Sequence, residues 1–547
     1  MTNKLRCFVI GEDSLLIKCC ETLLEKEHTI LGIAASNLSI RKWAKEKTIN
    51  VYELNSSLGK ELTSKTYDYL FSITNLSVLP DEIINSPKVS AINFHDGPLP
   101  KFAGINATSW ALMNQEKRYA ITWHEITSEV DKGDILKQVE FDIEDGEIAL
   151  SLNAKCFEAG ASAFEELVDE LANSTVKRIK QDFSKRSYFG KYKRPVAAAL
   201  IDWNNDAEKI LSFVHALNFG RYRNPLGLPK VKVGEKFFII PEIEITNTKS
   251  GKVPGTITSS NDNNIQVSTK TNDVKISKVL SIDGTQISIS NLVEQFSLKT
   301  GFNLNQIDSE TSKSITDINS SITKKEDYWV KELTGSELIN ISYAKRNSGT
   351  DNLPKYVEEN LSIDKKVFSS FSSNENQVPA FVTSLFSIFI GRHSGKNNFS
   401  LGFSNTELIN NAAKVGNLFA DFVPVKIDFN PEESIGSITK KIVEKLADTS
   451  ASKTFVKDIF VRYPELHPVK NESSEPVYPV AVVFVDSKSE VKPQDGSVLT
   501  FAISSDLKDV KFIFDSNSID QEDFRLMKSQ FSAFIDEAAA HQESAAA

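Results

Sequence analysis

Cysteine is scarce in this chain, with four among 547 residues. The thiols lack ligand-like spacing, and they fall in predicted strand and helix interiors at Cys7, Cys19, Cys20 and Cys156. A disulfide framework or a zinc site needs cysteines paired at short, regular intervals. We therefore expect reduced thiols and no metal site.

Long apolar runs are also absent. No uncharged stretch reaches the roughly 20 residues that span a bilayer, and the opening M-T-N-K-L-R precedes no apolar signal-peptide core. These absences predict a cytoplasmic protein with no membrane partner.

The chain also has fewer basic than acidic residues. It contains 63 Lys and Arg and 73 Asp and Glu, which gives a net charge of -10. Because nucleic-acid phosphates attract Lys and Arg, tRNA is a poor match as the main partner.

The remaining composition is that of a globular protein, with 40% hydrophobic and 25% charged residues. The length predicts two to four domains. Apolar strands over residues 5–10 and 29–35 flank an amphipathic helix over 15–26, and another buried strand covers 67–73. This order predicts a Rossmann-like, doubly wound α/β domain. Gly11 alone is not a G-x-G-x-x-G fingerprint, so a dinucleotide is not indicated.

The stretch from Ala91 to Gly104 reads A-I-N-F-H-D-G-P-L-P-K-F-A-G. Asn93 and His95 lie two residues apart, so both side chains face the same side of the predicted strand. The Gly and Pro residues that follow end the strand and stiffen the loop. In an open α/β sheet, ligands bind at this C-terminal edge. The pair indicates a chemical site, although two satisfied polar residues at a sheet edge would give the same pattern.

This stretch resembles the N-x-H…S-L-L-P-x-x-x-G signature of the folate-dependent formyltransferases. Downstream, S-E-V-D-K-G-D-I-L over 128–136 resembles the D-x-G-x-I-L loop of that family. The resemblance implies catalytic roles for Asn93, His95 and Asp131, 10-formyltetrahydrofolate as co-substrate, and no metal. Asp96 departs from the family, which commonly has Ser there, and the Leu99-Pro100 bond is cis in relatives.

The chemistry of formyl transfer suits these residue types. A histidine side chain ordinarily changes charge near neutrality, so a residue of this type at position 95 can act as general acid, general base or oxyanion donor. Asn93 offers an N–H to the oxyanion, and Asp131 can orient the imidazole. The family's pterin loop falls on residues 75–80 and implies folate contacts by the following residues: Leu76, Val78, Leu79 and, from the Asp131 loop, Gly133. For Leu76, Val78 and Leu79, the alternative interpretation is ordinary core packing under the loop. His124, on the strand before the Asp131 loop, is a secondary candidate near the acceptor cleft, and a satisfied strand histidine is the favoured interpretation.

Beyond the long helix predicted over 148–172, a basic segment covers 177–195. We interpret it mainly as a connector, with docking of an anionic partner as the alternative. The catalytic domain is therefore assigned to 1–198. From Ile201, I-D-W resembles the start of the family's second domain, and short strands separated by Asn, Asp and Gly predict a small OB-like β domain over 199–300. The Ser/Thr/Asn-rich 301–325 predicts a linker.

The C-terminal part carries a second resemblance. The segments E-D-Y-W-V-K-E-L (326–333) and V-G-N-L-F-A-D-F-V-P-V-K-I (415–427) are similar to condensation domains of nonribosomal peptide synthetases. They predict an α/β condensation-like (acyltransferase-like) half-domain over 326–547. The family's H-H-x-x-x-D-G motif is missing, which favours a docking platform over peptide-bond chemistry. The ending A-A-A-H-Q-E-S-A-A-A suggests either a flexible tail or a piece of a longer synthetase, in which adenylation and carrier domains would follow.

Together these resemblances predict an N-formyltransferase. Its formyl donor would be 10-formyltetrahydrofolate, and its acceptor the amine of an aminoacyl group on a carrier protein, which would initiate a formylated nonribosomal peptide. Acceptors that remain open are a nucleotide amino sugar, a hydroxyornithine side chain and methionyl-tRNA. A 10-formyltetrahydrofolate hydrolase, with water as acceptor, is a further alternative.

Overall fold

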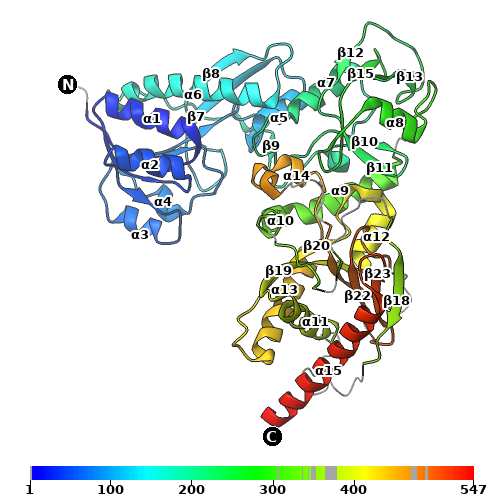
Figure 1. Ribbon diagram of the computed structural model, residues 1–547. Helices are drawn as coiled ribbons and strands as arrows, with labels where there is room; N and C mark the ends of the chain where they lie inside the picture. Colours follow the sequence, from blue (N-terminus) through cyan, green and yellow to red (C-terminus); the bar gives the residue numbers. More distant parts are fainter. Residues whose placement is uncertain are drawn as a thin grey trace.

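The computed structural model describes residues 3–304, 307–335, 337–342, 344–345, 353–363, 378–469, 477–486, 491–504 and 506–546. These residues form an N-terminal α/β domain, a small β domain in the middle, and a second α/β domain at the C-terminal end. Figure 1 shows the middle domain between the other two, with the C-terminal domain extending away from the N-terminal one.

The N-terminal domain is a seven-stranded sheet with helices on both faces. Its strands are β1 (Arg6–Gly11), β2 (Thr29–Ala34), β3 (Val51–Tyr52), β4 (Tyr69–Ile73), β5 (Ser90–His95), β7 (Arg118–Glu125) and β8 (Ile135–Asp142). Its helices are α1 (Asp13–Glu25), α2 (Leu38–Glu46), α3 (Leu58–Thr63), α4 (Asp81–Ile84), α5 (Ala107–Met113) and α6 (Ala149–Ala172). The strand order is β3-β2-β1-β4-β5-β7-β8, which confirms the α/β fold.

Alternation along β1 explains the two covered faces. Cys7 and Val9 pack into the larger apolar cluster, which includes α1 and α6, whereas Phe8 and Ile10 pack into a smaller cluster on the other face. All four cysteines are buried and free, as predicted. Strands β1 to β5 are parallel, but β7 pairs antiparallel with β5 and places His124 directly opposite Asn93.

The middle domain contains two four-stranded sheets. They are built from β10 (Lys230–Val233), β11 (Lys236–Ile239), β12 (Glu244–Ile245), β13 (Ile257–Ser260), β14 (Ile265–Val267), β15 (Val274–Ile276), β16 (Val279–Ser281) and β17 (Gln286–Ile287). Two helices flank them, α7 (Ala207–Ala216) and α8 (Ile289–Phe296). Strands β10 and β11 form a hairpin, in which Gly234 turns the chain at a φ of 58°. Strands β15 and β16 follow each other closely in the chain but belong to different sheets.

The segment predicted as a linker, 301–325, is mostly helical. Helix α9 (Ser309–Ile322) occupies most of it, and the Asp308 side chain accepts a hydrogen bond from the Thr311 N–H at its start. Ser309, Ser320 and Ser321 are exposed, whereas Ile315 and Ile322 are buried. Their spacing of seven residues, with Ile318 between them, places the three on one helical face.

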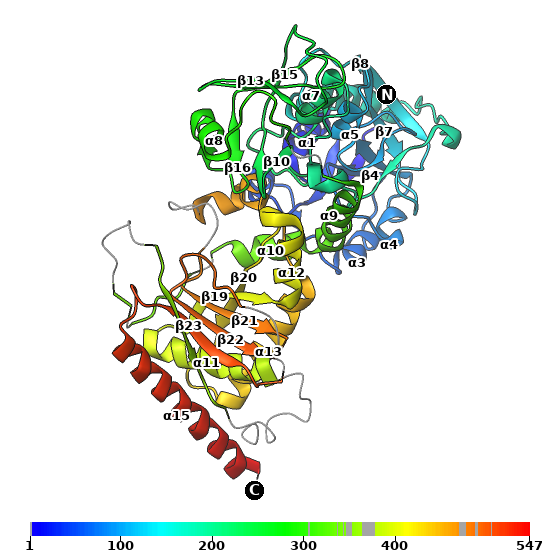
Figure 2. The ribbon, with the colours of Figure 1, turned by 90° about the vertical axis from the view of Figure 1, so that its right-hand side faces the viewer.

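The C-terminal domain is a six-stranded mixed sheet. Its strands follow the order β18-β23-β22-β21-β19-β20, with bounds β18 (Tyr356–Asn360), β19 (Asn398–Asn405), β20 (Val423–Asp428), β21 (Val480–Val485), β22 (Leu499–Ser504) and β23 (Val510–Asp515). Its helices are α10 (Glu326–Leu333), α11 (Val378–Ser394), α12 (Thr406–Val415), α13 (Ile435–Ser452), α14 (Ile459–Arg462) and α15 (Gln521–Ala546). Apolar side chains of α11, α13 and α15 pack in one core with the sheet, and Figure 2 shows α15 along the outside of this domain. Among the described helices, none has the length and apolar content that a membrane span requires.

Candidate active site

A cavity of about 730 Å³ opens at the C-terminal edge of the N-terminal sheet. The ends of β4 and β5 contribute residues to its wall, as does the loop after β7. Helix α6 and two segments further along the chain complete it. The residues relevant to its chemistry are Leu76, Val78, Leu79, Asn93, His95, Asp96, His124, Asp131, Tyr188, Lys191, Tyr222 and Arg223. The volume is that of a small-molecule site.

His95 is the last residue of β5, and its imidazole is 4% exposed. Nε2 lies 3.0 Å from the Phe102 carbonyl oxygen, which can only accept, so Nε2 carries the hydrogen and donates it. Nδ1 is left to face two carboxylates, with Asp131 and Asp96 oxygens each 3.9 Å away. Gly97 makes room for the ring, because a Cβ there would lie 2.7 Å from Nε2.

Asp131 is held from several sides and is 11% exposed. Its carboxylate accepts a hydrogen bond of 2.7 Å from the Gly104 N–H. Burial alone would raise the pKa of this carboxyl, but His95, His124 and the Gly104 N–H together lower it well below its usual value. Asp131 is therefore an anion at neutral pH, aimed at the imidazole.

His124 and Asn93 face each other across β7 and β5. His124 Nδ1 donates to the Glu125 carbonyl oxygen at 2.8 Å, so Nε2 can accept from the Asn93 amide at 3.3 Å. Nε2 also lies 3.5 Å from an Asp131 oxygen. The second Asn93 N–H is donated to the Phe94 carbonyl oxygen at 2.9 Å. The histidine is thus a hydrogen-bonded strand residue on the cavity wall, in contact with both Asn93 and Asp131.

Asp96 stands beside the imidazole on the cavity wall, with its side chain 31% exposed. Desolvation raises the pKa of Asp96, while the neighbouring His95 opposes the rise and Asp131 adds to it. Two carboxyl groups therefore flank one imidazole, and the one with the lower pKa is Asp131.

The predicted folate residues divide into two groups. Leu76 and Val78 line the cavity with 69% and 76% of their surface exposed, so they are not core residues under a loop. Leu79 lines the cavity and also packs against a buried cluster. Gly133, in contrast, is not among the lining residues. A Cβ there would lie 1.7 Å from the Glu125 carbonyl oxygen, so glycine is needed to pack the loop against β7 and not to approach a folate.

The basic segment 177–195 does more than connect two domains. Gln181 is buried, and its side-chain amide donates to the carbonyl oxygens of Asp131 and Gly133 at 2.9 and 2.7 Å. Arg186 also donates to the Asp131 carbonyl oxygen. Tyr188 lies in β9 (Tyr188–Phe189), which pairs with β6 (Ala103–Gly104), and it lines the cavity. The segment therefore fixes the Asp131 loop, and no motif in the sequence predicted this.

The arrangement can move a proton beside an electrophile. His95 Nδ1 can accept a proton, and Asp131 would stabilise the resulting imidazolium. The Asn93 N–H that faces His124 could donate to a developing oxyanion after turning away from that ring. Within the described residues, His, Cys, Asp and Glu form no group of three or more that could hold a metal ion.

Two family models match the chain. Residues 29–168 match the model described as formyl transferase, and residues 195–297 match the one described as formyl transferase, C-terminal domain. The matched regions coincide with most of the N-terminal domain and with the middle β domain.

Two curated relatives match part of the chain. A methionyl-tRNA formyltransferase of Clostridium novyi is 28% identical over 234 residues, which is 42% of this chain and 73% of that protein. The bifunctional polymyxin resistance protein ArnA of Wigglesworthia glossinidia brevipalpis is 31% identical over 226 residues, 41% of this chain and 32% of that protein. Among solved structures, WlaRD, a sugar 3N-formyl transferase crystallised in the presence of dTDP and 5-N-formyl-THF, aligns at 18% identity. The alignment has a TM-score of 0.42 and covers 50% of this chain and 98% of that one.

Proposed function

We propose that this chain, whose residues 29–168 and 195–297 match formyl transferase models, transfers the formyl group of 10-formyltetrahydrofolate to an amine bound in the cavity beside His95. The observation that carries this proposal is the His95 ring, with Nε2 tied to the Phe102 carbonyl and Nδ1 3.9 Å from the Asp131 carboxylate. This geometry leaves one ring nitrogen available for proton transfer and places a fixed anion beside it.

Formyl transfer to an amine makes one C–N bond and breaks another. His95 Nδ1 accepts the proton that the attacking amine loses, and it returns a proton to the departing nitrogen. Asp131 stabilises the imidazolium between these two transfers. Asn93 turns an N–H, now facing His124, towards the carbonyl oxygen that gains negative charge.

The loop after β4 supports binding of a pterin. Leu76 and Val78 present apolar surface to the cavity that a flat heteroaromatic ring would cover. We assign folate contacts to Leu76, Val78 and Leu79 and withdraw Gly133, whose missing side chain faces the protein backbone.

For the acceptor, we propose an aminoacyl group tethered to a carrier protein by phosphopantetheine. The support is the position of the C-terminal domain, whose Asp327 pairs with Arg223 at the cavity. A domain similar to the condensation domains of peptide synthetases would thus stand next to the acceptor entrance. The net charge of -10 argues against tRNA.

Labelled formyl-folate tests the proposal. The full chain is incubated with 10-formyltetrahydrofolate carrying a labelled formyl group and, separately, with aminoacyl carrier protein, methionyl-tRNA, a nucleotide amino sugar or hydroxyornithine. We expect label on the carrier-bound amino acid. Label on tRNA, the sugar or hydroxyornithine would replace the proposed acceptor, and label released only as formate would identify a hydrolase.

A further inference from the structure

Arg223 lies on the cavity wall but is held by the C-terminal domain. Its Nη2 pairs with Asp327 of α10, and its guanidinium carbon lies 4.7 Å from the centre of the Tyr463 ring. Both partners come from beyond the two domains that match the formyl transferase models. A residue of the cavity is thus positioned by a domain outside the family fold.

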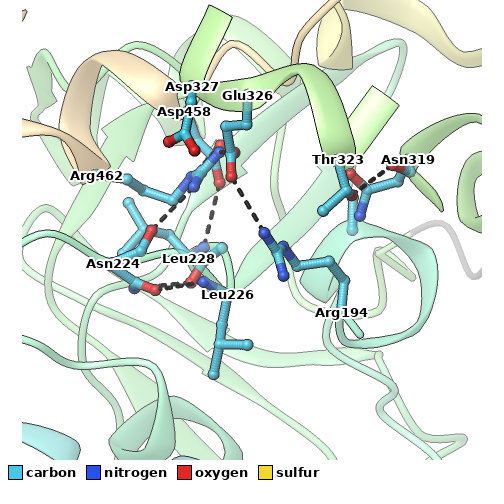
Figure 3. Close-up of polar contacts among 12 residues, drawn as sticks. Arg194, Asn224, Leu226, Leu228, Asn319, Thr323, Glu326, Asp327, Asp458 and Arg462 are labelled. Carbon is cyan, nitrogen blue, oxygen red and sulfur yellow. Dashed lines mark hydrogen bonds and ion pairs between the residues drawn. The ribbon is translucent and has the colours of Figure 1, made fainter. Parts of the chain in front are cut away.

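The residue that follows Arg223 is fixed more tightly still. The Asn224 N–H donates to the Arg462 carbonyl oxygen, and the Asn224 carbonyl oxygen accepts from Arg462 Nη1, both at 2.9 Å. Arg462 is 3% exposed and is itself held by Asp458 at 2.7 Å and by Glu326 (Figure 3). The backbone beside Arg223 therefore cannot shift without disturbing a buried ion network.

The guanidinium retains capacity for a ligand. Its planar fork has five N–H donors, and the Asp327 pair occupies Nη2. The ring of Tyr463 lies near the guanidinium, an arrangement that favours a planar cation. Side-chain exposure of 50% leaves the group accessible from the cavity.

A second cation, Lys191, also lines the cavity. Four acidic residues line it as well: Asp96 and Asp131, which lie beside His95, and Asp13 and Glu129. Glu129 is paired with Lys132 at 2.5 Å, and burial raises the pKa of Asp13, with Glu12 adding to the rise. Arginine and lysine contributed by separate segments are the usual partners of a phosphate.

We infer that Arg223 is a specificity-determining residue that binds a phosphate group of the acceptor, and that the C-terminal domain holds it in place through Asp327 and Arg462. The inference rests on the proposed function, since it places the acceptor in the same cavity. A phosphopantetheine arm and a nucleotide would both supply this phosphate.

A binding experiment tests the site without requiring turnover. Titration calorimetry on the full chain compares 4′-phosphopantetheine with pantetheine, which lacks the phosphate, and with thymidine diphosphate. We expect about tenfold tighter binding of phosphopantetheine than of pantetheine, and loss of that preference in Arg223→Gln. Arg221→Gln is the matched control, because Arg221 is exposed on the same loop and is not among the lining residues. Equal binding of both probes, or a preference that survives Arg223→Gln, overturns the inference.

Kinetics separate a binding role from a structural one. With aminoacyl-phosphopantetheine as acceptor, Arg223→Gln should raise KM about tenfold with kcat nearly unchanged, and Arg223→Lys should recover part of the loss. Asp327→Asn should raise KM in the same direction by a smaller factor. A fall in kcat for phosphate-free acceptors as well would assign Arg223 to structure only.

The outcomes also separate this inference from the proposed function. If label appears only as formate while phosphopantetheine still binds through Arg223, the proposed acceptor is wrong and the phosphate site stands. If thymidine diphosphate depends on Arg223 and phosphopantetheine does not, the site binds a nucleotide. If carrier-bound amino acid is formylated equally by wild type and Arg223→Gln, the function stands and the site is wrong.

Discussion

Asp131 shows at the residue scale how backbone and charge are arranged together. Its φ of 52° is in the left-handed region, which Asp tolerates better than most residues. That conformation is held by hydrogen bonds to its carbonyl oxygen from Gln181 and Arg186 and to its carboxylate from Gly104. The carboxylate is thus oriented before any substrate binds.

Replacing Asp131 by Asn should reveal the lowered pKa as a pH dependence of stability. The folded pKa lies below the unfolded value of about 3.9, so the contribution of Asp131 is present above that value. It is lost as pH falls through the folded pKa. We expect Asp131→Asn to lower the free energy of unfolding by about 1–3 kcal/mol at pH 7, with the gap constant to pH 5 and closing below pH 4. Urea unfolding at pH 7, 5 and 3.5 measures this; a gap that closes near pH 6.5 would point to a histidine instead.

His95→Asn should reduce formyl transfer about 100- to 10,000-fold, because it removes the only ring nitrogen that faces both carboxylates. Single-turnover transfer from labelled formyl-folate measures the effect. His393→Gln, in α11 of the C-terminal domain, is the control and should retain full activity. Unchanged transfer by His95→Asn would remove the proton-transfer role from this residue.

The sequence motifs predicted which residues lie together at the C-terminal edge of the N-terminal sheet. The alternation of side chains along β5 and the strand-ending Gly and Pro residues after His95 can both be read from the sequence. The cluster of Asn93, His95 and Asp131 is where the motifs indicated. Gln181 could not be predicted, since a single glutamine in a basic segment carries no chemical signature. His124 had a usable signal, namely its place on the strand before the Asp131 loop, but its pairing opposite Asn93 depends on the strand order.

At the scale of elements, Gly133 decides how closely the Asp131 loop packs on β7. Gly133→Ala should lower stability by about 1–3 kcal/mol and reduce formyl transfer, because the new Cβ would displace the Glu125 carbonyl that orients His124. Thermal unfolding and initial rates measure the two effects. Gly146→Ala is the control: it has no atom within 4 Å and a φ of 85°, so it should cost about 1 kcal/mol in stability with activity retained. Equal activity in both variants would show that the loop tolerates displacement.

The ends of helices and strands were predicted well where buried residues recur at regular spacing along the whole element. They were predicted poorly where a turn divides the segment. The helix predicted over 148–172 is α6, because its apolar face repeats at helical spacing. Helix α9 was predicted as a linker because composition outweighed the spacing of Ile315, Ile318 and Ile322. Its burial comes from contacts with distant segments, and these are not visible locally.

At the scale of the whole molecule, the middle and C-terminal domains share one interior. An apolar cluster joins Ala198, Phe237, Ile315 and Leu418, which come from four segments of the chain. Beside it, Lys230 of β10 is fully buried and pairs with Asp458 at 2.5 Å. The sequence could suggest three domains. It could not show that Lys230 of the middle domain is paired with Asp458 of the C-terminal domain.

Asp458→Asn should therefore weaken the middle domain as well as its own. Burial would raise the pKa of Asp458, but Arg462 and Lys230 hold it below its usual value, so the substitution leaves Lys230 buried without its counter-charge. We expect a loss of about 3–5 kcal/mol in the free energy of unfolding. Hydrogen exchange should also become faster in β10 and β11, across the domain boundary.

Lys511→Gln is the matched control for this exchange measurement, because it removes an ion pair with Glu358 that lies wholly inside the C-terminal sheet. It should leave exchange in β10 and β11 unchanged. If Asp458→Asn accelerates exchange only beyond residue 326, the two domains are energetically separate. The C-terminal domain could then not hold Arg223 in the way its contacts indicate. Faster exchange on both sides of the boundary would instead mean that the domain beyond the family fold is part of the framework of the formyl transfer site.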